Sequence, residues 1–300
     1  MTRHPETRTA PFAGPWDAQV QVPLADLRAA PDDSAERVNQ ALLGTPLAVL
    51  DVQRDPARGS WLQVRLADYA GWMRESSVLR QPPAEGRRIR VAAARAELRI
   101  LGDDSTLSGA TLAVYAGTTL PLAEDASAAG MEGIVVVVLP DGTEALANPA
   151  DLAPMATEYR GEAPAIIDSA RCFLGTPYLW GGMTHQGVDC SGLMQIAYRV
   201  HGHTLPRDAD QQFHGAGEPV AEGEWQPGDL LFFGDPPDKV THVVMYVGDG
   251  RIIHASGSAG GVVVQSIDPA APDYHRRKDS YLGARRVLGT GVRPEVARDL

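Results

Sequence analysis

The sequence predicts two small all-β barrels followed by a domain of mixed α+β structure. Between residues 17 and about 155, short β-branched or apolar runs alternate with Gly, Pro and Asp, a pattern typical of small barrels. From residue 160 the apolar residues take helical spacing, and strand patterns return only after residue 229. A segment with helices first and strands after them predicts an α+β domain.

The β-rich region contains a weak internal repeat. One copy ends in AGWMRESSVL (70–79) and the other in EALANPADLAPM (144–155), with the Pro- and Gly-rich link RQPPAEGRR (80–88) between them. We therefore expect a tail at 1–16, one barrel at 17–82 and a second at 87–155. The strand candidates cover residues 47–52, 61–66, 71–73, 88–93, 111–115, 118–122 and 133–139.

The third domain is expected at 160–290, before a C-terminal tail at 291–300. An amphipathic helix is predicted from Pro164 to Gly175, because its apolar residues recur at helical intervals. A second helix begins at Cys190 and ends at Gly202, where glycine stops it. Predicted strands follow at 229–233, 242–247, 251–255 and 261–265.

Composition limits the possible functions. The chain is 44% hydrophobic and 22% charged, as expected of a globular protein, and its net charge of −11 argues against nonspecific binding to nucleic acid or anionic membrane. We find neither the apolar run of a signal peptide nor the roughly 20 apolar residues of a membrane span. With Met1 as the native start, we expect a cytoplasmic protein. The only two cysteines, Cys172 and Cys190, are too few for a disulfide framework, and a bridge between them would consume Cys190.

Cys190 is the first candidate for chemistry. The segment TPYLWGGMTHQGVDCSGLM (176–194) places it in the first turn of a predicted helix, after a glycine-rich approach. Unpaired N–H groups and the positive end of the helix dipole stabilise a thiolate there, so we expect a lowered pKa for Cys190. The alternative is a small buried hydrophobic residue, which is the more common fate of a free cysteine.

Two histidines strengthen the catalytic interpretation. His242 opens one predicted strand and His254 lies near the end of the next, with a Gly-Asp-Gly turn at 248–250 between them. A three-residue loop would pair Val247 with Arg251 and put both imidazoles on one face, within side-chain reach. A two-residue loop would put them on opposite faces. Acyl transfer by a cysteine needs a base and a third group that fixes the tautomer of that base.

At this point the residues resemble a known family, the NlpC-type cysteine peptidases. The resemblance covers about residues 160–290 and rests on five ordered motifs, PYLWGG (177–182), DCSGL (189–193), LPRDADQQ (205–212), QPGDLLFF (226–233) and THVVMYVGDGRIIHAS (241–256). It implies a papain-like α+β fold and a triad of Cys190, His242 and His254, with no cofactor or metal. It also implies that the Tyr178 hydroxyl and the Cys190 N–H face the oxyanion, a favourable position for hydrogen-bond donors.

Two SH3-like domains before such a peptidase, with no export signal, resemble the subgroup that recycles murein peptides inside the cell. That subgroup cleaves between γ-D-glutamate and the following diaminopimelate or lysine, in murein tripeptides or tetrapeptides with a free N-terminal L-alanine. The resemblance gives Asp189 the task of pairing with that ammonium, and places Trp180 and Ser191 in the same pocket. The alternative role for Asp189 is a helix N-cap, and both roles are compatible.

In the same subgroup the first SH3-like domain contributes a tyrosine and an acidic residue beside the substrate's amino end. Tyr69 matches the tyrosine, although it is equally consistent with a packed barrel aromatic. The acidic residue is expected after Gly44, where this sequence has Thr45. The sequence therefore leaves the acidic partner unassigned.

The remaining polar residues are expected to be structural. Arg207 and Asp208 follow Pro206 in a loop, which we expect an ion pair to hold, and direct catalysis is not expected of them. The run HRRKD (275–279) is predicted to be a solvated face. Five further histidines are predicted to be surface or structural residues: His185, His201, His203, His214 and His275. The sequence contains no nucleotide-binding glycine motif.

Three other functions compete with the peptidase interpretation. The same triad would serve an acyltransferase or transpeptidase, or an enzyme acting on a lipid acyl chain. Cysteine, histidine and aspartate side chains also make zinc sites, here from Asp189, Cys190, His242 and His254. Finally, the SH3-like domains would suit a cell-wall binding adaptor with an inactive peptidase domain.

Overall fold

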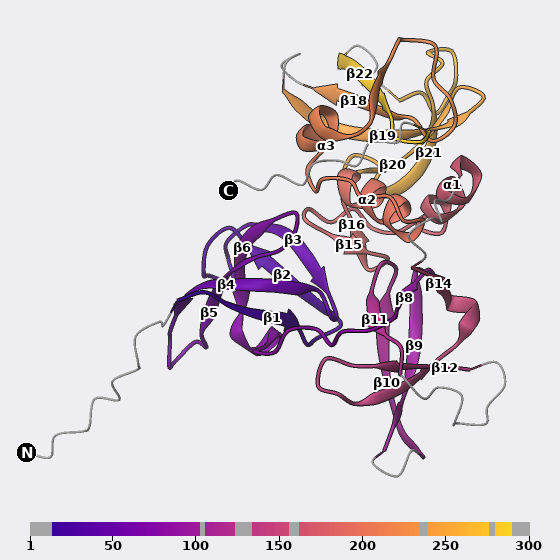
Figure 1. The fold of residues 1–300 in the computed structure, drawn as a ribbon. Coiled ribbons are helices and arrows are strands. Elements are labelled where there is room, and N and C mark those ends of the chain that lie inside the picture. The colour runs from indigo at the N-terminus through magenta and orange to yellow at the C-terminus, as the bar shows by residue number, and fades with distance from the viewer. Residues whose placement is uncertain are drawn as a thin grey trace, which may run out of the picture.

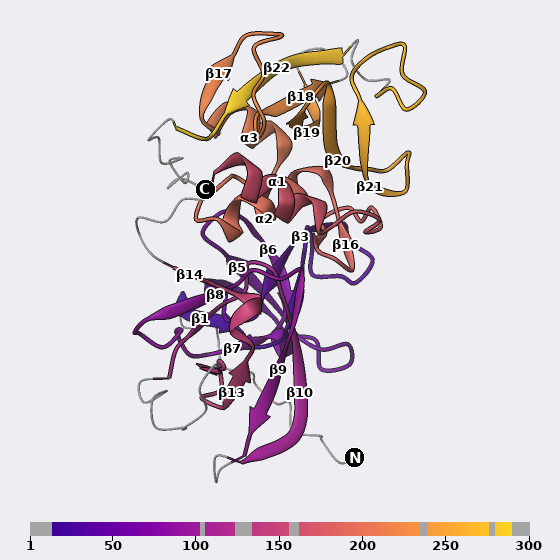
Figure 2. The ribbon, with the colours of Figure 1, turned by 90° about the vertical axis from the view of Figure 1, so that its right-hand side faces the viewer.

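The computed structural model describes residues 14–102, 106–123, 134–155, 162–234, 239–275 and 280–289. Two β modules lie on one side of the molecule, and the sheet of the C-terminal domain lies on the other (Figure 1). Figure 2 shows from a second side that helices α1 and α2 lie between the modules and that sheet. None of the helices in these described ranges is long and apolar enough to cross a bilayer.

Module 1 is a seven-stranded sheet with strand order β3-β2-β6-β5-β4-β1-β7. Alternate residues of its strands, such as Leu47 and Val49 or Leu62 and Val64, are buried in its own core. The sequence predicted β4, β5 and β6 but not the first three strands, which carry more polar residues. Its strands are β1 Trp16–Val20, β2 Leu24–Arg28, β3 Arg37–Leu42, β4 Pro46–Gln53, β5 Trp61–Arg65, β6 Ala70–Arg74 and β7 Val78–Leu79.

Module 2 consists of a four-stranded sheet, β10-β9-β13-β12, and a three-stranded sheet, β11-β8-β14. Its strands are β8 Arg88–Val91, β9 Arg95–Leu101, β10 Leu107–Tyr115, β11 Thr119–Pro121, β12 Val135–Val138, β13 Glu144–Ala147 and β14 Leu152–Pro154. The weak repeat is visible in both modules, because a short 3₁₀ helix, Glu75–Ser77 or Pro149–Asp151, separates the last two strands of each.

The C-terminal domain has a six-stranded antiparallel sheet with strand order β17-β22-β18-β19-β20-β21. The predicted helices and strands are present, although the first helix ends at Arg171 and not at Gly175. Helix α3 and strands β15, β16, β17 and β22 were not predicted. Its elements are α1 Ala163–Arg171, β15 Met183–Thr184, β16 Gly187–Val188, α2 Cys190–Val200, α3 Ala209–Gly215, β17 Glu218–Val220, β18 Leu230–Gly234, β19 Val240–Gly248, β20 Arg251–Ser256, β21 Gly261–Ser266 and β22 Tyr281–Arg286.

Helix α2 lies at the centre of the molecule. All of its residues except Arg199 are buried, and it packs against α1 and against strands β19 and β20. Leu42 of module 1 and Tyr115 of module 2 belong to the same hydrophobic cluster as the residues of α2. Burial on every side fixes the position of the helix and of its first residue, Cys190.

Candidate active site

The hairpin between β19 and β20 sets the register of the two histidines. Its tip has only two residues, Asp249 and Gly250, both with positive φ (50° and 66°), as in a type I′ turn. Gly248 pairs with Arg251 across this tip, and the register then shifts at Val247, which forms a β-bulge. The loop is therefore the shorter of the two alternatives, for which the histidines were expected on opposite faces. The bulge at Val247 restores the register that a three-residue loop would have given, so both histidines remain on one face.

His242 and His254 form the contact that the sequence predicts. Nε2 of His242 lies 2.8 Å from Nδ1 of His254, and the two side chains are almost completely buried, at 7% and 1% exposure. The other ring nitrogen of His254, Nε2, lies 2.8 Å from Oε1 of Gln265 on β21. An imidazole held at one nitrogen by a second imidazole has the geometry of an oriented general base.

Cys190 occupies the first turn of α2, and backbone N–H groups of Val243 and Ser191 hydrogen-bond its sulfur. Val243 directly follows His242, so the strand that carries this histidine contacts the thiol through its backbone. Burial, together with the neighbouring Asp189 carboxylate, raises the pKa of Cys190 to about 11. The predicted lowering is thus wrong, because loss of solvation outweighs the N–H groups at the helix start. Both cysteines are free, Cys172 on the surface and Cys190 in the interior, which rules out a bridge between them.

Asp189 caps the active-site helix and forms a buried ion pair. Its Oδ1 accepts from the Gly192 N–H at 2.7 Å, and its Oδ2 accepts from the Gly181 N–H at 2.9 Å. Arg207 donates to the same two oxygens, at 3.0 and 2.6 Å. Ser191 lies in this cluster, where its hydroxyl accepts from Arg207 at 2.9 Å. The N-cap role is present, and both carboxylate oxygens are engaged by protein donors rather than directed at a cleft.

Arg207 was expected to hold its loop through an ion pair. The structure shows such a pair, in which Arg207, at 1% exposure, contacts Asp189. Its Nε donates at 2.7 Å to Oδ1 of Asn39, a buried residue of module 1. The backbone N–H of Met183 also donates to module 1, to Oε1 of Gln40 at 3.0 Å. Module 1 is therefore hydrogen-bonded to the immediate surroundings of the helix start.

An acidic residue of module 1, Glu36, lies beside Trp180. Nε1 of Trp180 donates to Oε1 of Glu36 at 2.7 Å. Glu36 lies just before β3, so it precedes Gly44 in the chain. Only the fold could identify it, because 144 residues separate the two partners.

Tyr69 lies close to this acidic residue. Its hydroxyl hydrogen-bonds the Asp208 carboxylate, and burial, followed by the charge of Asp208, raises the pKa of Tyr69 to about 12. Glu36 contributes to the same shift, which shows that it is near the hydroxyl. The tyrosine ring also packs against the core of module 1. Both expectations for Tyr69, packing and proximity to the site, agree with its position.

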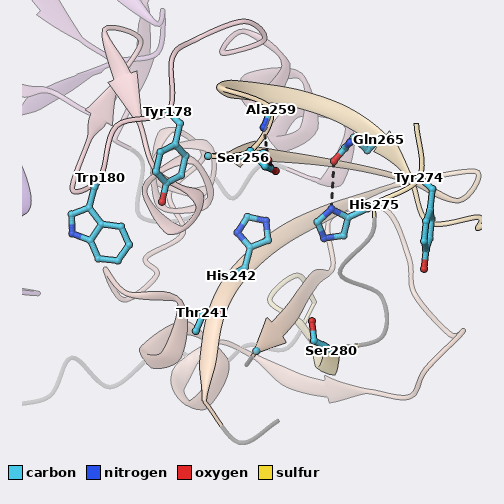
Figure 3. A pocket seen from close by; sticks show the side chains of 13 residues that line it. Tyr178, Trp180, Thr241, His242, Ser256, Ala259, Gln265, Tyr274, His275 and Ser280 are labelled. Atoms are coloured by element: carbon cyan, nitrogen blue, oxygen red, sulfur yellow. Dashed lines mark hydrogen bonds between the residues drawn. The ribbon is translucent and has the colours of Figure 1, made fainter. Parts of the chain in front are cut away.

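A cavity of about 980 Å³ extends to both sides of His242. Figure 3 shows Tyr178 and Trp180 on one side of His242, with Gln265 and His275 on the opposite side. The full lining is Tyr178, Trp180, Gly234, Thr241, His242, Ser256, Gly257, Ser258, Ala259, Gln265, Tyr274, His275 and Ser280. Tyr178 is positioned by its backbone, whose N–H donates to Gly260 O at 3.1 Å.

His275 was predicted to belong to a solvated charge run, and this prediction is wrong for that residue. Its ring is 5% exposed and lies 5.8 Å from the ring of His242 and 4.8 Å from that of His254, centroid to centroid. The rest of the run, residues 276–279, lies outside the described residues. A single histidine in a charged run gives no sequence signal that it folds back onto a neighbouring strand.

The alternative zinc site is not supported by the geometry. Within the ranges that the structure describes, no group of three or more His, Cys, Asp or Glu side chains is placed to hold a metal ion. Asp189 faces Arg207, whereas the histidines face each other and Gln265. The residues named for zinc therefore belong to two separate hydrogen-bond networks.

Comparison with known proteins agrees with the site. The NlpC/P60 family model matches residues 175–279, and a bacterial dipeptidyl-peptidase Sh3 domain matches residues 27–78. The chain is 31% identical over 268 residues to a γ-D-glutamyl-L-lysine dipeptidyl-peptidase of Bacillus cereus, covering 83% of this chain and 74% of that protein. It is 30% identical over 264 residues to dipeptidyl-peptidase 6 of Lysinibacillus sphaericus, covering 84% and 92%.

A solved structure also covers all three domains. The crystal structure of an NlpC/P60 family protein from Bacillus cereus superposes with a TM-score of 0.75 at 27% identity, covering 91% of this chain and 99% of that one. The papain-like α+β fold behind SH3-type β domains and the buried Cys and His side chains define a cysteine peptidase. The chain belongs to the NlpC/P60 family. Membership of this family implies that its substrates are peptides derived from peptidoglycan.

Proposed function

We propose that this protein is an endopeptidase that cleaves between γ-D-glutamate and the following diamino acid in short murein peptides with a free N-terminal L-alanine. The observation that carries the proposal is the contact between Trp180 and Glu36. Because Trp180 also lines the active-site cavity, this contact places a carboxylate of module 1 at the edge of the cleft. A negative group there suits a substrate that begins with an ammonium ion.

The position of the other acidic residues supports Glu36 as the partner of that ammonium. Asp189, the residue first expected to bind it, has its charge compensated by Arg207. Glu36 lies near the hydroxyl of Tyr69, and the Trp180 side chain beside it is 58% exposed, so a ligand can reach this corner. Glu36, Tyr69 and Trp180 would then hold the amino end, while Asp189 and Ser191 hold the start of α2.

The part of the cavity on the far side of His242 would receive the leaving diamino acid. Hydroxyl groups and imidazoles line much of it, and side chains of this kind hydrogen-bond both the amino and the carboxylate groups of a diamino acid. The scissile carbonyl would lie between the two regions, beside Cys190. This arrangement accommodates either diaminopimelate or lysine.

The proposed reaction begins with a neutral thiol. As the sulfur of Cys190 attacks the γ-carbonyl carbon, His242 takes its proton and a tetrahedral oxyanion forms. The Tyr178 hydroxyl and the Cys190 N–H would donate hydrogen bonds to that oxygen. Collapse breaks the C–N bond, and His242 returns the proton to the leaving amine. Water, deprotonated by His242, then attacks the thioester and releases the L-Ala-γ-D-Glu acid and the free thiol.

Mass spectrometry of peptide digests tests the proposal directly. Purified enzyme should convert L-Ala-γ-D-Glu-diaminopimelate or L-Ala-γ-D-Glu-L-Lys to the dipeptide and the free diamino acid, and Cys190→Ala should be inactive. Cleavage at another bond, or capture of the acyl group by an added amine in place of water, would contradict it. The latter product would instead indicate a transferase.

The pocket assignment has its own test. N-acetylation of the substrate should reduce kcat/KM of the wild type, and Glu36→Gln should lower kcat/KM for the free peptide by about 10- to 100-fold, the range expected for a charge-assisted hydrogen bond. Glu75→Gln, the same change at an exposed position of module 1, is the control. Equal rates on free and acetylated peptides would overturn the ammonium site. A role in murein recycling would place the enzyme in the cytoplasm, which cell fractionation would test.

A further inference from the structure

We propose that Gln265 is a positioning residue that fixes the tautomer of His254 and, through it, of His242. The inference rests on the proposed role of His242 as the base for Cys190. Gln265 belongs to none of the sequence motifs described above. In the proposed reaction it neither transfers a proton nor binds the oxyanion. Its role would be to determine which nitrogen of His242 carries the proton.

The strand register brings Gln265 to the histidine pair. On the β20–β21 ladder His254 pairs with Val263, so Gln265 is the next residue on the same face of β21. Its Oε1 lies 2.8 Å from Nε2 of His254. Nδ1 of the same ring lies 2.8 Å from Nε2 of His242. An unbroken series of hydrogen bonds therefore runs from the Gln265 amide to the catalytic imidazole.

The chemistry of these atoms determines the protonation pattern. A carbonyl oxygen only accepts hydrogen bonds, so Nε2 of His254 must carry a proton. A neutral imidazole has one donor and one acceptor, which leaves Nδ1 of His254 to accept from Nε2–H of His242. Nδ1 of His242 is then the lone pair that can take the thiol proton. The same pattern persists after that transfer, since Nε2–H of the imidazolium still donates to His254.

The orientation of the amide is the point on which this pattern depends. With the Gln265 NH₂ group turned to His254, the His254 proton would move to Nδ1 and face His242. His242 would then carry its own proton on Nδ1 and could not act as the base. Nδ1 of His275 lies 3.4 Å from the same Oε1 and would be a second donor to the amide oxygen in the Nδ1–H tautomer. The His275 ring is held by Phe233, 5.0 Å away between centroids.

The experiment compares two replacements of Gln265. Gln265→Met keeps the approximate length of the side chain but removes the acceptor. We expect kcat to fall about 2- to 10-fold with KM unchanged, because the base then spends roughly half of its time or more in the wrong tautomer. Gln265→Glu keeps an acceptor at this position and should restore kcat near pH 8. Gln63→Met, the same replacement on strand β5, is the control.

The ¹⁵N NMR spectrum distinguishes a change in the His254 tautomer from a loss of folded structure. The ¹⁵N shifts of the His254 ring, assigned with a His254→Asn variant, should show a proton on Nε2 in the wild type and a mixture of tautomers in Gln265→Met. Wild-type kcat in Gln265→Met, or a wild-type His254 protonated on Nδ1, would overturn the inference. The proposed function fails separately, if Cys190→Ala remains active, so the two failures are distinguishable.

Discussion

Arg207 joins module 1 to the active-site helix through Asn39, whose Oδ1 accepts from the buried Nε of Arg207 at 2.7 Å. The same guanidinium pairs with Asp189, the N-cap of α2. The start of the helix that carries Cys190 is therefore held by a residue of another domain. Module 1 therefore helps to position the active-site helix, in addition to any role in binding the substrate.

Removing the Asn39 amide should lower both stability and activity. Asn39→Ala leaves a buried charged donor without its acceptor, at a cost of about 1–3 kcal/mol in the free energy of unfolding. We also expect a lower kcat, because the position of the α2 start depends on Arg207. Urea unfolding and steady-state kinetics measure the two effects. Gln53→Ala, at an exposed position of module 1, should change neither, and an Asn39→Ala enzyme with unchanged stability would contradict this role.

Removing only one partner of the buried Arg207–Asp189 ion pair should strongly destabilise the protein. Arg207→Met leaves the Asp189 carboxylate buried without its partner and should destabilise the protein by about 3–5 kcal/mol. Adding Asp189→Asn should recover part of that loss, so the double variant should be less destabilised than the sum of the single variants. Arg171→Met breaks the exposed pair with Asp168, and its expected effect is about 0–1 kcal/mol. If the losses of stability in the two single variants simply add in the double variant, Arg207 and Asp189 are not directly coupled.

The raised pKa of Cys190 predicts a neutral thiol in the resting enzyme. The thiolate absorbance that distinguishes wild type from Cys190→Ala should be absent at pH 7 and appear only near pH 11. The raised pKa also makes the free energy of unfolding depend on pH. Above about pH 9 the thiol ionises in the unfolded protein but not in the folded protein, which favours the unfolded state. Stability of the wild type relative to Cys190→Ala should therefore fall as pH rises from 9 to 11. A thiolate signal at pH 7 would instead indicate a preformed ion pair with His242.

Tyr178 should contribute to the transition state and little to substrate binding. Tyr178→Phe removes one oxyanion donor, for which a loss of about 10²–10³ in kcat is expected with KM nearly unchanged. Tyr115→Phe removes a hydroxyl that accepts from Gln186 outside this cavity and is the control. Equal kinetic effects of the two changes would argue against a specific role of Tyr178.

The sequence predicted those site features whose signals are local. Cys190 at a helix start and two histidines on adjacent strands are recognisable from spacing within short segments. The register was left open, because it depended on the length of the loop, and the bulge at Val247 that keeps both histidines on one face has no signal in the sequence. Helix α3 was missed because seven residues are too few to show a helical period.

The features that were missed depend on contacts between distant segments. Asn39 and Arg207 are 168 positions apart, and nothing in either segment indicates the other. The contact between Glu36 and Trp180 could not be predicted either, because the fold of module 1, and not sequence order, decides which of its loops lies beside Trp180. The pKa of Cys190 depends on burial by surrounding elements, which helix position alone does not show.

The close approach of module 1 to the glycine-rich segment before α2 gives the last prediction. A Cβ atom at Gly181 would lie 2.6 Å from the carbonyl oxygen of Arg37, and Gly181 has a φ of +71°. Gly175 has a similar φ of +79° but open space around it. Alanine at either position should therefore cost about 1–2 kcal/mol in backbone strain. Only Gly181→Ala should also push module 1 away from the site.

The two alanine variants separate these effects. Gly181→Ala should raise KM for the free tripeptide and reduce its preference over the N-acetylated form, since Glu36 moves with Arg37, its neighbour in the chain. Gly175→Ala should leave both quantities unchanged despite a similar loss of stability. If both variants bind the substrate as the wild type does, the contact between module 1 and the Gly181 segment does not shape the amino-end pocket.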